Sequence, residues 1–332
     1  MKVRLKDIAD QAGVSIALVS NYLRNHQAAR MSQATRARIE KALSELDYQP
    51  SWAARTLRTG KSNIIGLVAT MLNYEVNQSE MLALFNEAVQ RGFQLFVQYT
   101  GECPERLPGA VKTLLAQGCD MVIISGNLTD EDCSALSEFA SKVLLINSNK
   151  TAEIPGRTLR YDYESAVLEA LDDLAGKGHK NICYLCNKEW RIDQRMNAFL
   201  TRYPEENLVD CNFYKERSQE WFEQLLTEKK SCTAFFCIND FIALELMQYM
   251  LLSNRKVPQD YSVLGFDNVH AAALTVPSLS SIARPLAAVA RKVLDQCEAI
   301  IKDSNHEFVV EIFKCIYIPR SSTAPVNICK EV

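Results

Sequence analysis

The chain has 332 residues, 48% of them hydrophobic, and a formal net charge of -3 at pH 7. This length accommodates two or three domains with sizeable apolar cores. The charge is unevenly placed, because residues 1–62 contain 11 Lys/Arg and 5 Asp/Glu, a net charge of +6, which leaves -9 for the remainder. A basic N-terminal segment on an acidic body argues for a polyanionic partner that binds this segment only.

The composition also argues against secreted and membrane-spanning classes. No run approaches the ~18 consecutive apolar residues that a membrane-spanning helix needs. The start, MKVRLKDIA, lacks the apolar region of a secretory signal. The 11 cysteines have irregular spacing, which does not resemble a disulfide framework. We therefore expect a cytoplasmic protein with free, mostly buried thiols and no membrane association.

Residues 5–23, LKDIADQAGVSIALVSNYL, predict two helices joined by a tight turn. Apolar residues recur at helical spacing before Gly13, which turns the chain without a Cβ penalty, and Ser15 can cap the second helix. This arrangement is typical of a helix-turn-helix unit, although an ordinary surface hairpin of helices has the same pattern. With Val19 and Leu23 inward, the outer face is small and polar and fits a DNA major groove.

Two further N-terminal segments follow. Ser32 can cap a third helix over 33–46, which completes a three-helix domain whose core is too thin to be more than marginally stable alone. After Pro50, Ser51–Arg58 can form two helical turns, but an isolated helix this short is unstable in water. This segment is either a linker with chance helicity or one that folds only when docked, and a basic link, Thr59–Ser62, closes it.

From Ile64 onward, short apolar runs alternate with helical patterns. The runs predicted as strands are residues 64–70, 93–98, 121–125, 143–146, 182–186, 234–238 and 262–266. Strands that alternate with helices of 10–15 residues imply βαβ units and parallel sheets. The set is too long for one sheet and restarts near Arg160. We therefore predict two doubly wound subdomains with a ligand cleft at the carboxyl ends of their strands.

Short motifs in both halves of the chain carry a family resemblance. In the first half they are Lys6-Asp7-Ile8-Ala9, Ala12-Gly13-Val14-Ser15, Val19-Ser20, Leu46-Asp47-Tyr48 and Gly60-Lys61-Ser62. In the second half they are Gly178-His179, Asn239-Asp240, Gly265-Phe266-Asp267-Asn268, Pro277-Ser278-Leu279-Ser280-Ser281-Ile282 and Arg320-Ser321-Ser322. With these motifs in this order, the chain resembles the lactose-repressor family of bacterial transcription regulators over nearly its whole length.

The resemblance implies a domain plan. Residues 1–50 are expected to form an all-α helix-turn-helix headpiece, 51–62 a hinge helix and linker, and 63–332 a two-lobed α/β core like a periplasmic sugar-binding protein. Lobe one is expected over about 63–160 with a return near 285–305, and lobe two over about 161–284 with a return near 306–320. The implied partners are double-stranded operator DNA, a small-molecule effector, and a second copy in a homodimer or a higher oligomer.

The resemblance assigns DNA-binding roles position by position. Matches to the second helix, which meets bases and phosphates, are Ser15, Ile16, Ala17, Ser20 and Asn21, with Arg24 as the cation at its end. Phosphate neutralisation is expected of Lys6 and Arg36. Matches to the minor-groove hinge helix, with a leucine wedge that kinks the duplex, are Ala54, Arg55, Leu57 and Arg58.

This chain departs from the family pattern at three headpiece positions. Arg4 stands where a capping Thr usually precedes the first helix, Leu18 replaces a usual Thr, and Asn21 replaces a usual Arg. The replaced Thr and Arg would have supplied phosphate contacts and a direct guanine contact. We therefore expect an operator sequence that differs from those of relatives.

Seven polar residues are expected to face the effector cleft: Asn73, Asn147, Arg195, Asn239, Asp240, Asp267 and Arg284. Arg195 and Asp267 match positions that commonly hydrogen-bond a sugar or base. A second arginine, Arg284, favours an effector with a phosphate or carboxylate. Two alternatives stay open: Arg284 forms a structural ion pair with Asp267 or Asp240, and Asp240 only caps a helix.

The function predicted from these residues is a DNA-binding transcription regulator, a repressor controlled by a sugar, sugar derivative or other small polar metabolite. No catalytic constellation is visible, because Cys183-x-x-Cys186 lies inside a predicted strand and the four histidines lack metal-ligand spacing. We expect no enzyme activity, no cofactor and no metal. The alternative is a solute-binding module without DNA regulation, against which the basic N-terminal segment argues.

Overall fold

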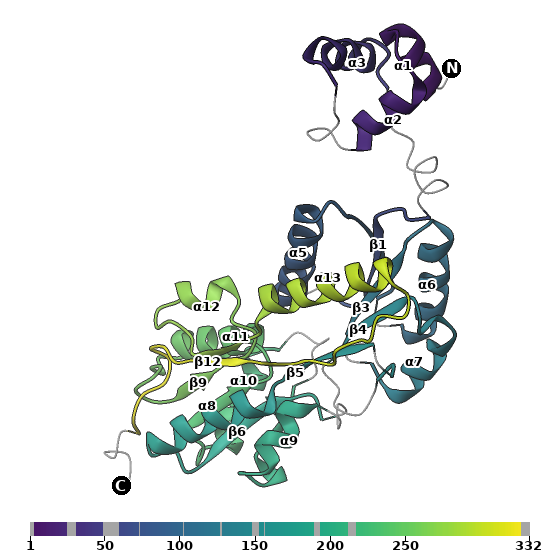
Figure 1. Ribbon diagram of the computed structural model, residues 1–332. Helices are drawn as coiled ribbons and strands as arrows, with labels where there is room; N and C mark the ends of the chain where they lie inside the picture. Colours follow the sequence, from purple (N-terminus) through teal and green to yellow (C-terminus); the bar gives the residue numbers. More distant parts are fainter. Residues whose placement is uncertain are drawn as a thin grey trace. The chain divides into compact units, whose positions relative to one another are not determined.

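The computed structural model divides the chain into two compact units, which we call the headpiece (Met1–Ser62) and the body (Asn63–Val332). The structure describes residues 3–24, 31–48, 60–72, 74–101, 103–126, 128–147, 153–155, 157–188, 193–211 and 217–326 (Figure 1). The hinge positions and one cleft position predicted from the sequence lie outside these ranges: Ala54, Arg55, Leu57, Arg58 and Asn73. The side chains of Arg24 and Asn147 also lie outside the described part.

The described part of the headpiece contains the predicted helix-turn-helix and a third helix. The elements are α1 (Leu5–Ala12), α2 (Ile16–Arg24) and α3 (Gln33–Glu45). Gly13 joins α1 to α2 with a φ of +64°, a left-handed conformation that glycine adopts without steric penalty. The Ser32 side chain accepts a hydrogen bond from the Thr35 N–H and caps α3. A small core holds the three helices together: Ile8, Ala9, Ala12, Val19, Tyr22, Ile39 and Ala42.

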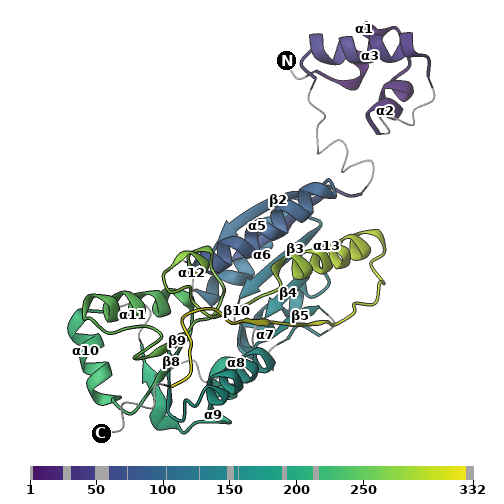
Figure 2. The same cartoon turned by 90° about the vertical axis from the view of Figure 1, so that its left-hand side faces the viewer.

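The first lobe of the body is a six-stranded parallel sheet in the order β11-β5-β4-β3-β1-β2 (Figures 1 and 2). Its strands are β1 (Ile64–Ala69), β2 (Gln94–Tyr99), β3 (Met121–Gly126), β4 (Val143–Asn147), β5 (Thr158–Asp162) and β11 (Ile312–Lys314). The helices of this lobe are α5 (Glu75–Gln90), α6 (Leu107–Ala116), α7 (Asp130–Ala135) and α13 (Leu286–Lys302), with short 3-10 turns at Pro104–Arg106 and Ser137–Phe139.

Both faces of the central strands of this sheet are covered by helices. Ile65 and Ile123 pack in one cluster with residues of α5 and α13, which lie side by side although they are far apart in the sequence (Figure 1). Val68 and Val122 point the other way, into a cluster with α6 and α7. Because successive side chains of a strand point to opposite faces, both sets must be apolar, which explains the continuous apolar run of β1.

The second lobe is a four-stranded parallel sheet in the order β7-β6-β8-β9. Its strands are β6 (Ile182–Cys186), β7 (Leu208–Asp210), β8 (Ala234–Cys237) and β9 (Ser262–Leu264). Its helices are α8 (Glu164–Gly176), α9 (Gln194–Leu200), α10 (Gln219–Glu228), α11 (Asp240–Leu252) and α12 (His270–Leu274), with a 3-10 turn at Glu205–Asn207. The predicted fold class, two parallel-sheet subdomains behind a helix-turn-helix headpiece, is therefore confirmed.

The chain passes between the lobes differently from the expected plan. The first sheet extends through β5 to Asp162, and it takes up β11, which pairs with β5 in parallel. Directly after it, β12 (Ile316–Ile318) pairs antiparallel with β10 (Ser281–Ala283). The return expected in lobe two near 306–320 is thus wrong for 312–314. The apolar alternation of this segment gave no sign of which sheet each half would join.

The cysteines also depart from expectation at one pair. Cys183 on β6 and Cys232, just before β8, form a disulfide with their Cα atoms 6.1 Å apart. The pairing of β6 with β8, which sets Ile182 opposite Ala234, brings them together. The expectation of free thiols is therefore wrong for this pair. The other eight cysteines in the described ranges are free, and all of these except Cys103 are buried.

Among the described residues, none of the helices combines the length and the apolar character that crossing a membrane requires.

Candidate functional site

The beginning of α2 presents a strip of side chains on the headpiece surface. Val19 and Tyr22 are buried against the other helices, which fixes the face that α2 turns outward. The outward side chains are exposed or half-buried: Ser15, Ile16, Ala17, Ser20 and Asn21. Ile16 is a large apolar side chain that is 47% exposed. An apolar group beside small polar ones suits contact with thymine methyl groups and base edges.

The two predicted phosphate-neutralising residues differ in their surroundings. Lys6 is exposed on α1. Arg36 is half-buried, with its guanidinium carbon 5.5 Å from the centroid of the Tyr22 ring. The Tyr22 hydroxyl donates to Glu40 at 2.7 Å, and burial together with this carboxylate raises the pKa of Tyr22 to about 12. Arg36 therefore also contributes to the packing of α3 against α2.

A cavity of about 430 Å³ lies between the two lobes of the body. Much of its lobe-one wall is apolar and is formed by Leu67, Met71, Leu72, Met81, Leu84, Leu107, Leu128 and Ile146. Its polar lining comes from both lobes and includes Asn77, Glu80, Ser125, Asp132, Asp193, Gln194, Arg195, Asn239, Asp267 and Arg284. An apolar wall opposite a few convergent polar groups is the usual design of a small-molecule site.

Arg195, predicted from the sequence, lines this cavity but is firmly bound within the protein. Its Nε and Nη2 donate to the carboxylate of Asp193 at 2.6–3.1 Å. Its Nη1 donates to the carbonyl oxygen of Ile238 at 2.6 Å. The guanidinium carbon also lies 4.9 Å from the centroid of the Phe266 ring. Asp193 and Phe266 therefore fix the orientation of Arg195 before any ligand binds.

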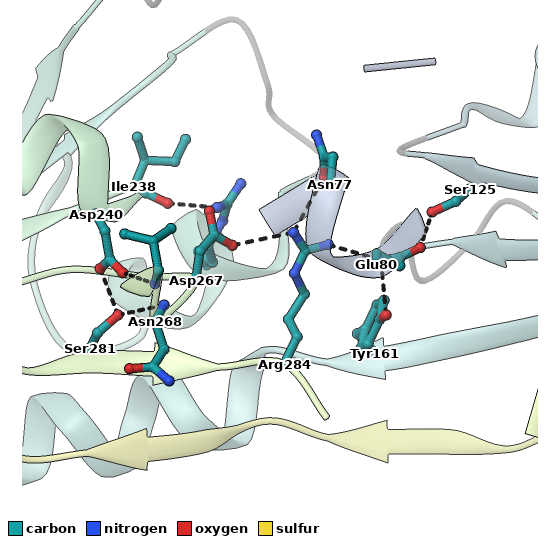
Figure 3. A network of polar contacts seen from close by, with 12 residues as sticks. Asn77, Glu80, Ser125, Tyr161, Ile238, Asp240, Asp267, Asn268, Ser281 and Arg284 are labelled. Carbon is teal, nitrogen blue, oxygen red and sulfur yellow. Dashed lines mark hydrogen bonds and ion pairs between the residues drawn. The ribbon is translucent and has the colours of Figure 1, made fainter. Parts of the chain in front are cut away.

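Arg284 lies at the junction of the two lobes and is held more loosely (Figure 3). Its Nη1 is 3.3 Å from Glu80 Oε2, and its Nη2 is 3.3 Å from Asn77 Oδ1 and 3.5 Å from Asp267 Oδ1. The Nε of Arg284 is buried and has no hydrogen-bond partner within the described ranges. The structure thus pairs Arg284 with Asp267, as one alternative from the sequence held, and adds Glu80 as a second carboxylate partner.

Glu80 is the polar centre of the lobe-one side (Figure 3). It projects from α5, is 3% exposed, and accepts hydrogen bonds from the hydroxyls of Ser125 and Tyr161. The Tyr161 hydroxyl lies 3.0 Å from Glu80 Oε2. Burial, and next the charge of Glu80, raise the pKa of Tyr161, so this hydroxyl stays protonated and acts as a donor.

Asp267 lies on the cavity wall with an unusual backbone conformation. Its φ is +103°, which is rare for a residue with a side chain and costs conformational energy. Burial raises the pKa of this carboxyl group, and the nearby guanidiniums of Arg284 and Arg195 oppose that shift. Such non-glycine outliers cluster at ligand sites, because the surrounding structure must hold them in place.

Asn239 and Asp240 serve the fold more than the cavity. Asn239 lines the cavity, but its side chain caps α11 by accepting from the Ile242 N–H at 2.9 Å. Asp240, which was predicted to face the cleft, is not among the residues that line the cavity. Its carboxylate accepts from the Ser281 hydroxyl at 2.6 Å and the Val269 N–H at 2.8 Å. Burial raises the pKa of Asp240 to about 8.

Several cavity residues were not predicted from the sequence: Asn77, Glu80, Ser125, Tyr161, Tyr163 and Gln194. One signal for them was present. The buried residues of α5 follow one stripe, Val76, Glu80, Leu84 and Ala88, at intervals of four. A carboxylate in an otherwise apolar stripe is costly unless it is paired, so Glu80 could have been singled out. No comparable pattern marks Tyr161 or Ser125.

No group of three or more His, Cys, Asp or Glu side chains with the arrangement of a metal site occurs in the part of the chain that the structure describes.

Comparison with known families identifies both units of the chain. Residues 4–51 match the family model of bacterial regulatory proteins of the lacI family, and residues 171–323 match a periplasmic binding protein-like domain. The first match covers the helices whose outer face is described above. The second covers most of lobe two, including Arg195 and Asp267.

Curated relatives match over most of their length. The HTH-type transcriptional repressor PurR of Mannheimia succiniciproducens is 27% identical, with 87% of this chain and 89% of that protein covered. The transcriptional regulator DegA of Bacillus subtilis is 28% identical, with 86% and 88% covered. Catabolite control protein A of Priestia megaterium is 26% identical, with 89% and 92% covered. The prediction of a regulator and not an enzyme is thereby confirmed.

Solved structures share the fold. The lac repressor dimer bound to operator and the anti-inducer ONPF superimposes with a TM-score of 0.83 at 24% identity, covering 98% of this chain and 100% of that one. A complex of the transcriptional regulator CelR with cellobiose gives a TM-score of 0.68 at 21% identity, covering 96% and 99%. The helix-turn-helix headpiece, the two-lobed body and the two family matches lead to one conclusion: the chain joins a DNA-binding domain of the lacI family of bacterial regulatory proteins to a periplasmic binding protein-like domain, and it is a DNA-binding transcription regulator.

Proposed function

We propose that this protein is a repressor that binds a specific operator as a homodimer, and that an uncharged polar metabolite in the interlobe cavity controls its affinity for the operator. One observation carries the proposal: a cavity with convergent polar groups from both lobes lies in a chain whose headpiece exposes the outer face of α2. A ligand that contacts both lobes can favour one arrangement of them over another.

In the headpiece, the proposal gives base contacts to the exposed strip on α2. Asn21 is suited to adenine, whose N6 and N7 an asparagine amide can bind together, and Ile16 to a thymine methyl group. Lys6 and Arg36 are assigned to phosphates, which they bind without sequence preference. Ala54, Arg55, Leu57 and Arg58 retain their proposed role as a minor-groove hinge, which rests on the family resemblance alone.

The proposed homodimer is supported by apolar side chains that the body leaves exposed. On lobe one they gather on α5 and the edge strand β2: Leu82, Phe85, Val89, Phe96, Val97 and Tyr99. On lobe two they lie on and after α11 and α12: Phe241, Leu251, Leu252, Leu274 and Val276. Exposed large apolar side chains on several elements are a feature of interaction surfaces, and a second copy of the chain would cover them symmetrically.

The cavity itself favours an uncharged effector with several hydroxyl or amide groups. The polar lining offers both acceptors, such as the carboxylates of Glu80 and Asp267, and donors, such as the guanidinium of Arg284. A ligand hydroxyl can donate to the first and accept from the second. The apolar wall, with Leu72 and Met81, would pack against the carbon skeleton of the ligand.

The experiment that tests the DNA-reading part is selection of double-stranded DNA from a random library by the full-length protein. We expect an enriched pseudo-palindromic site, because a symmetric dimer binds two related half-sites. Asn21→Ala should weaken binding of that site by about 5- to 150-fold and relax the preference at one base pair of each half-site. Failure to enrich any site would contradict the proposal.

A matched lysine substitution separates phosphate contacts from base contacts. Lys6→Gln should weaken binding to all sequences alike and reduce the slope of log affinity against log salt by about 1. Lys302→Gln, which removes a lysine of the body that pairs with Glu298, should leave both quantities unchanged. A loss of sequence preference in Lys6→Gln would instead assign this residue to base recognition.

A further inference from the structure

We propose that Glu80 determines the charge of the ligand that the interlobe cavity accepts: it occupies Arg284 and thereby excludes anionic effectors. The inference rests on the proposed function of the cavity as the effector site, and it names the residue that restricts the effector class. It reverses the expectation from the sequence alone, in which a second arginine favours a phosphate or carboxylate.

The position of Glu80 argues that its charge serves a purpose. It lies on the buried stripe of α5 between Val76 and Leu84, where an apolar side chain would pack without cost. Instead a carboxylate is buried there and satisfied by three groups: the Ser125 hydroxyl, the Tyr161 hydroxyl and a guanidinium nitrogen of Arg284. The Ser125 and Tyr161 hydroxyls each have one proton to donate, and both donate it to Glu80. These two hydrogen bonds hold the carboxylate in place.

Arg284 is the group that this arrangement restrains. Its side chain is 10% exposed, and its contacts to Glu80, Asn77 and Asp267 are all 3.3–3.5 Å long. Its Nε has no partner among the described residues. A guanidinium with long contacts and an unused donor would bind a phosphate or carboxylate at once if no carboxylate competed for it.

Arg195 cannot take this role, because its donors are already engaged at shorter distances. Asp193 accepts from its Nε and Nη2, and the carbonyl of Ile238 accepts from its Nη1 at 2.6 Å. The less tightly engaged positive charge of the cavity is therefore that of Arg284, and the carboxylate that neutralises it decides whether an anion can bind.

The net charge of a cluster of ionisable residues that line the cavity also argues against an anionic ligand. Arg195 and Arg284 face three carboxylates, those of Glu80, Asp193 and Asp267. With all groups ionised the cluster carries one net negative charge, and with Asp267 protonated it is neutral. Neither state has the surplus positive charge that would compensate the lost hydration of a buried anion. Loss of the Glu80 charge would shift either state by one unit toward positive.

The test measures binding of inorganic phosphate to the full-length protein by isothermal titration and by thermal shift. Wild type should show no saturable binding at millimolar phosphate. Glu80→Gln, which keeps the size and a hydrogen-bond acceptor, should bind phosphate with a dissociation constant at least tenfold below any value for wild type. Glu80→Met, of similar length and without charge, should do the same, and it serves if the glutamine variant does not fold.

Two controls confine the effect to the cavity. Glu87→Gln removes a carboxylate from the same helix, where it pairs with Arg91 outside the cavity, and should leave phosphate binding as in wild type. The double variant Glu80→Gln/Arg284→Gln should lose the binding that Glu80→Gln gains. Phosphate binding by wild type as tight as that of Glu80→Gln, or no gain in either Glu80 variant, would overturn the proposal.

These outcomes are separate from the test of the proposed function. If the Glu80 variants gain no phosphate binding while a neutral ligand still alters operator affinity in wild type, this proposal fails and the proposed function stands. If no ligand of any charge alters operator affinity, the proposed function fails whatever the variants bind.

Discussion

The headpiece and the body use opposite means to prepare a binding surface. The headpiece exposes neighbouring residues of one helix and devotes few residues to its core, of which Ile8, Val19, Tyr22 and Ile39 are the largest. The body buries its recognition groups, so that Glu80, Asp267 and the guanidinium of Arg284 face each other inside a cavity between two large sheets.

In the headpiece, different residues provide stability and recognition. In the body, the same residues provide both. The outer face of α2 can change without loss of packing, because Val19 and Tyr22 hold the helix from behind. A change to the cavity alters charges that already neutralise each other, and it leaves a buried partner unpaired. We therefore expect operator specificity to be easier to alter by mutation than effector specificity.

The largest expected effect compares equal truncations in the two units. Ile39→Ala in the headpiece and Ile123→Ala in β3 each remove a fully buried side chain, at a cost of about 2–5 kcal/mol. In a unit as small as the headpiece this exceeds or matches the whole stability, so Ile39→Ala should abolish operator binding. Ile123→Ala should lower the melting temperature of the body and leave operator binding measurable.

Circular dichroism melts with electrophoretic mobility assays would show both effects. If both variants lost operator binding to the same extent, the headpiece would be no less stable than the body. That result would contradict the proposed difference between the two units.

The next effect compares the two cavity arginines. Arg195→Gln leaves Asp193 buried without its bidentate partner, and such a loss costs about 3–5 kcal/mol. Arg284→Gln should cost less, because its contacts are longer and the Glu80 carboxylate keeps the hydroxyls of Ser125 and Tyr161 as donors. Chemical denaturation of both variants gives the two costs. A larger loss for Arg284→Gln would show that it is a structural clamp and not a restrained ligand-binding group.

The last expected effect is a pH dependence of the stability of the body. The folded-state pKa of Asp240, about 8, lies above the value of about 3.9 that an unfolded chain has. The folded state therefore binds more protons between these values, and the stabilising contribution present below about pH 4 is lost as the pH rises toward 8. Asp240→Asn should flatten this decline in a series of denaturation midpoints, whereas Asp303→Asn, on the surface after α13, should leave it unchanged. If stability declined with rising pH as steeply in Asp240→Asn as in wild type, the decline would come from other titrating groups.

The sequence was informative wherever the determinants are local. The turn at Gly13, the cap at Ser32 and the apolar strand β6 are each set by neighbouring residues, and each was predicted within a residue or two. Arg195, Asp267 and Arg284 were placed in the cleft through the family resemblance, and all three line the cavity.

The sequence could not predict which residues far apart in the chain contact each other. Glu80 meets Arg284 across 204 residues, and Tyr161 meets Glu80 across 81, only because α5, β5 and the segment after β10 converge between the lobes. The division of residues 312–318 between two sheets and the Cys183–Cys232 disulfide have the same origin. Asp240 was predicted for the cleft as a carboxylate at a helix start, but Asn239 caps that helix, and Asp240 instead binds the Ser281 hydroxyl and the Val269 N–H across the fold.

The most direct test of the account is a thermodynamic cycle on the full-length protein, with its selected operator and a neutral ligand found by thermal-shift screening. Operator affinity is measured with and without saturating ligand, and ligand affinity with and without operator. We predict that the ligand changes the dissociation constant for the operator by at least about fivefold, and that the operator changes the dissociation constant for the ligand by the same factor. A ligand that binds the cavity and leaves operator affinity unchanged would contradict the claim that the cavity controls the headpiece.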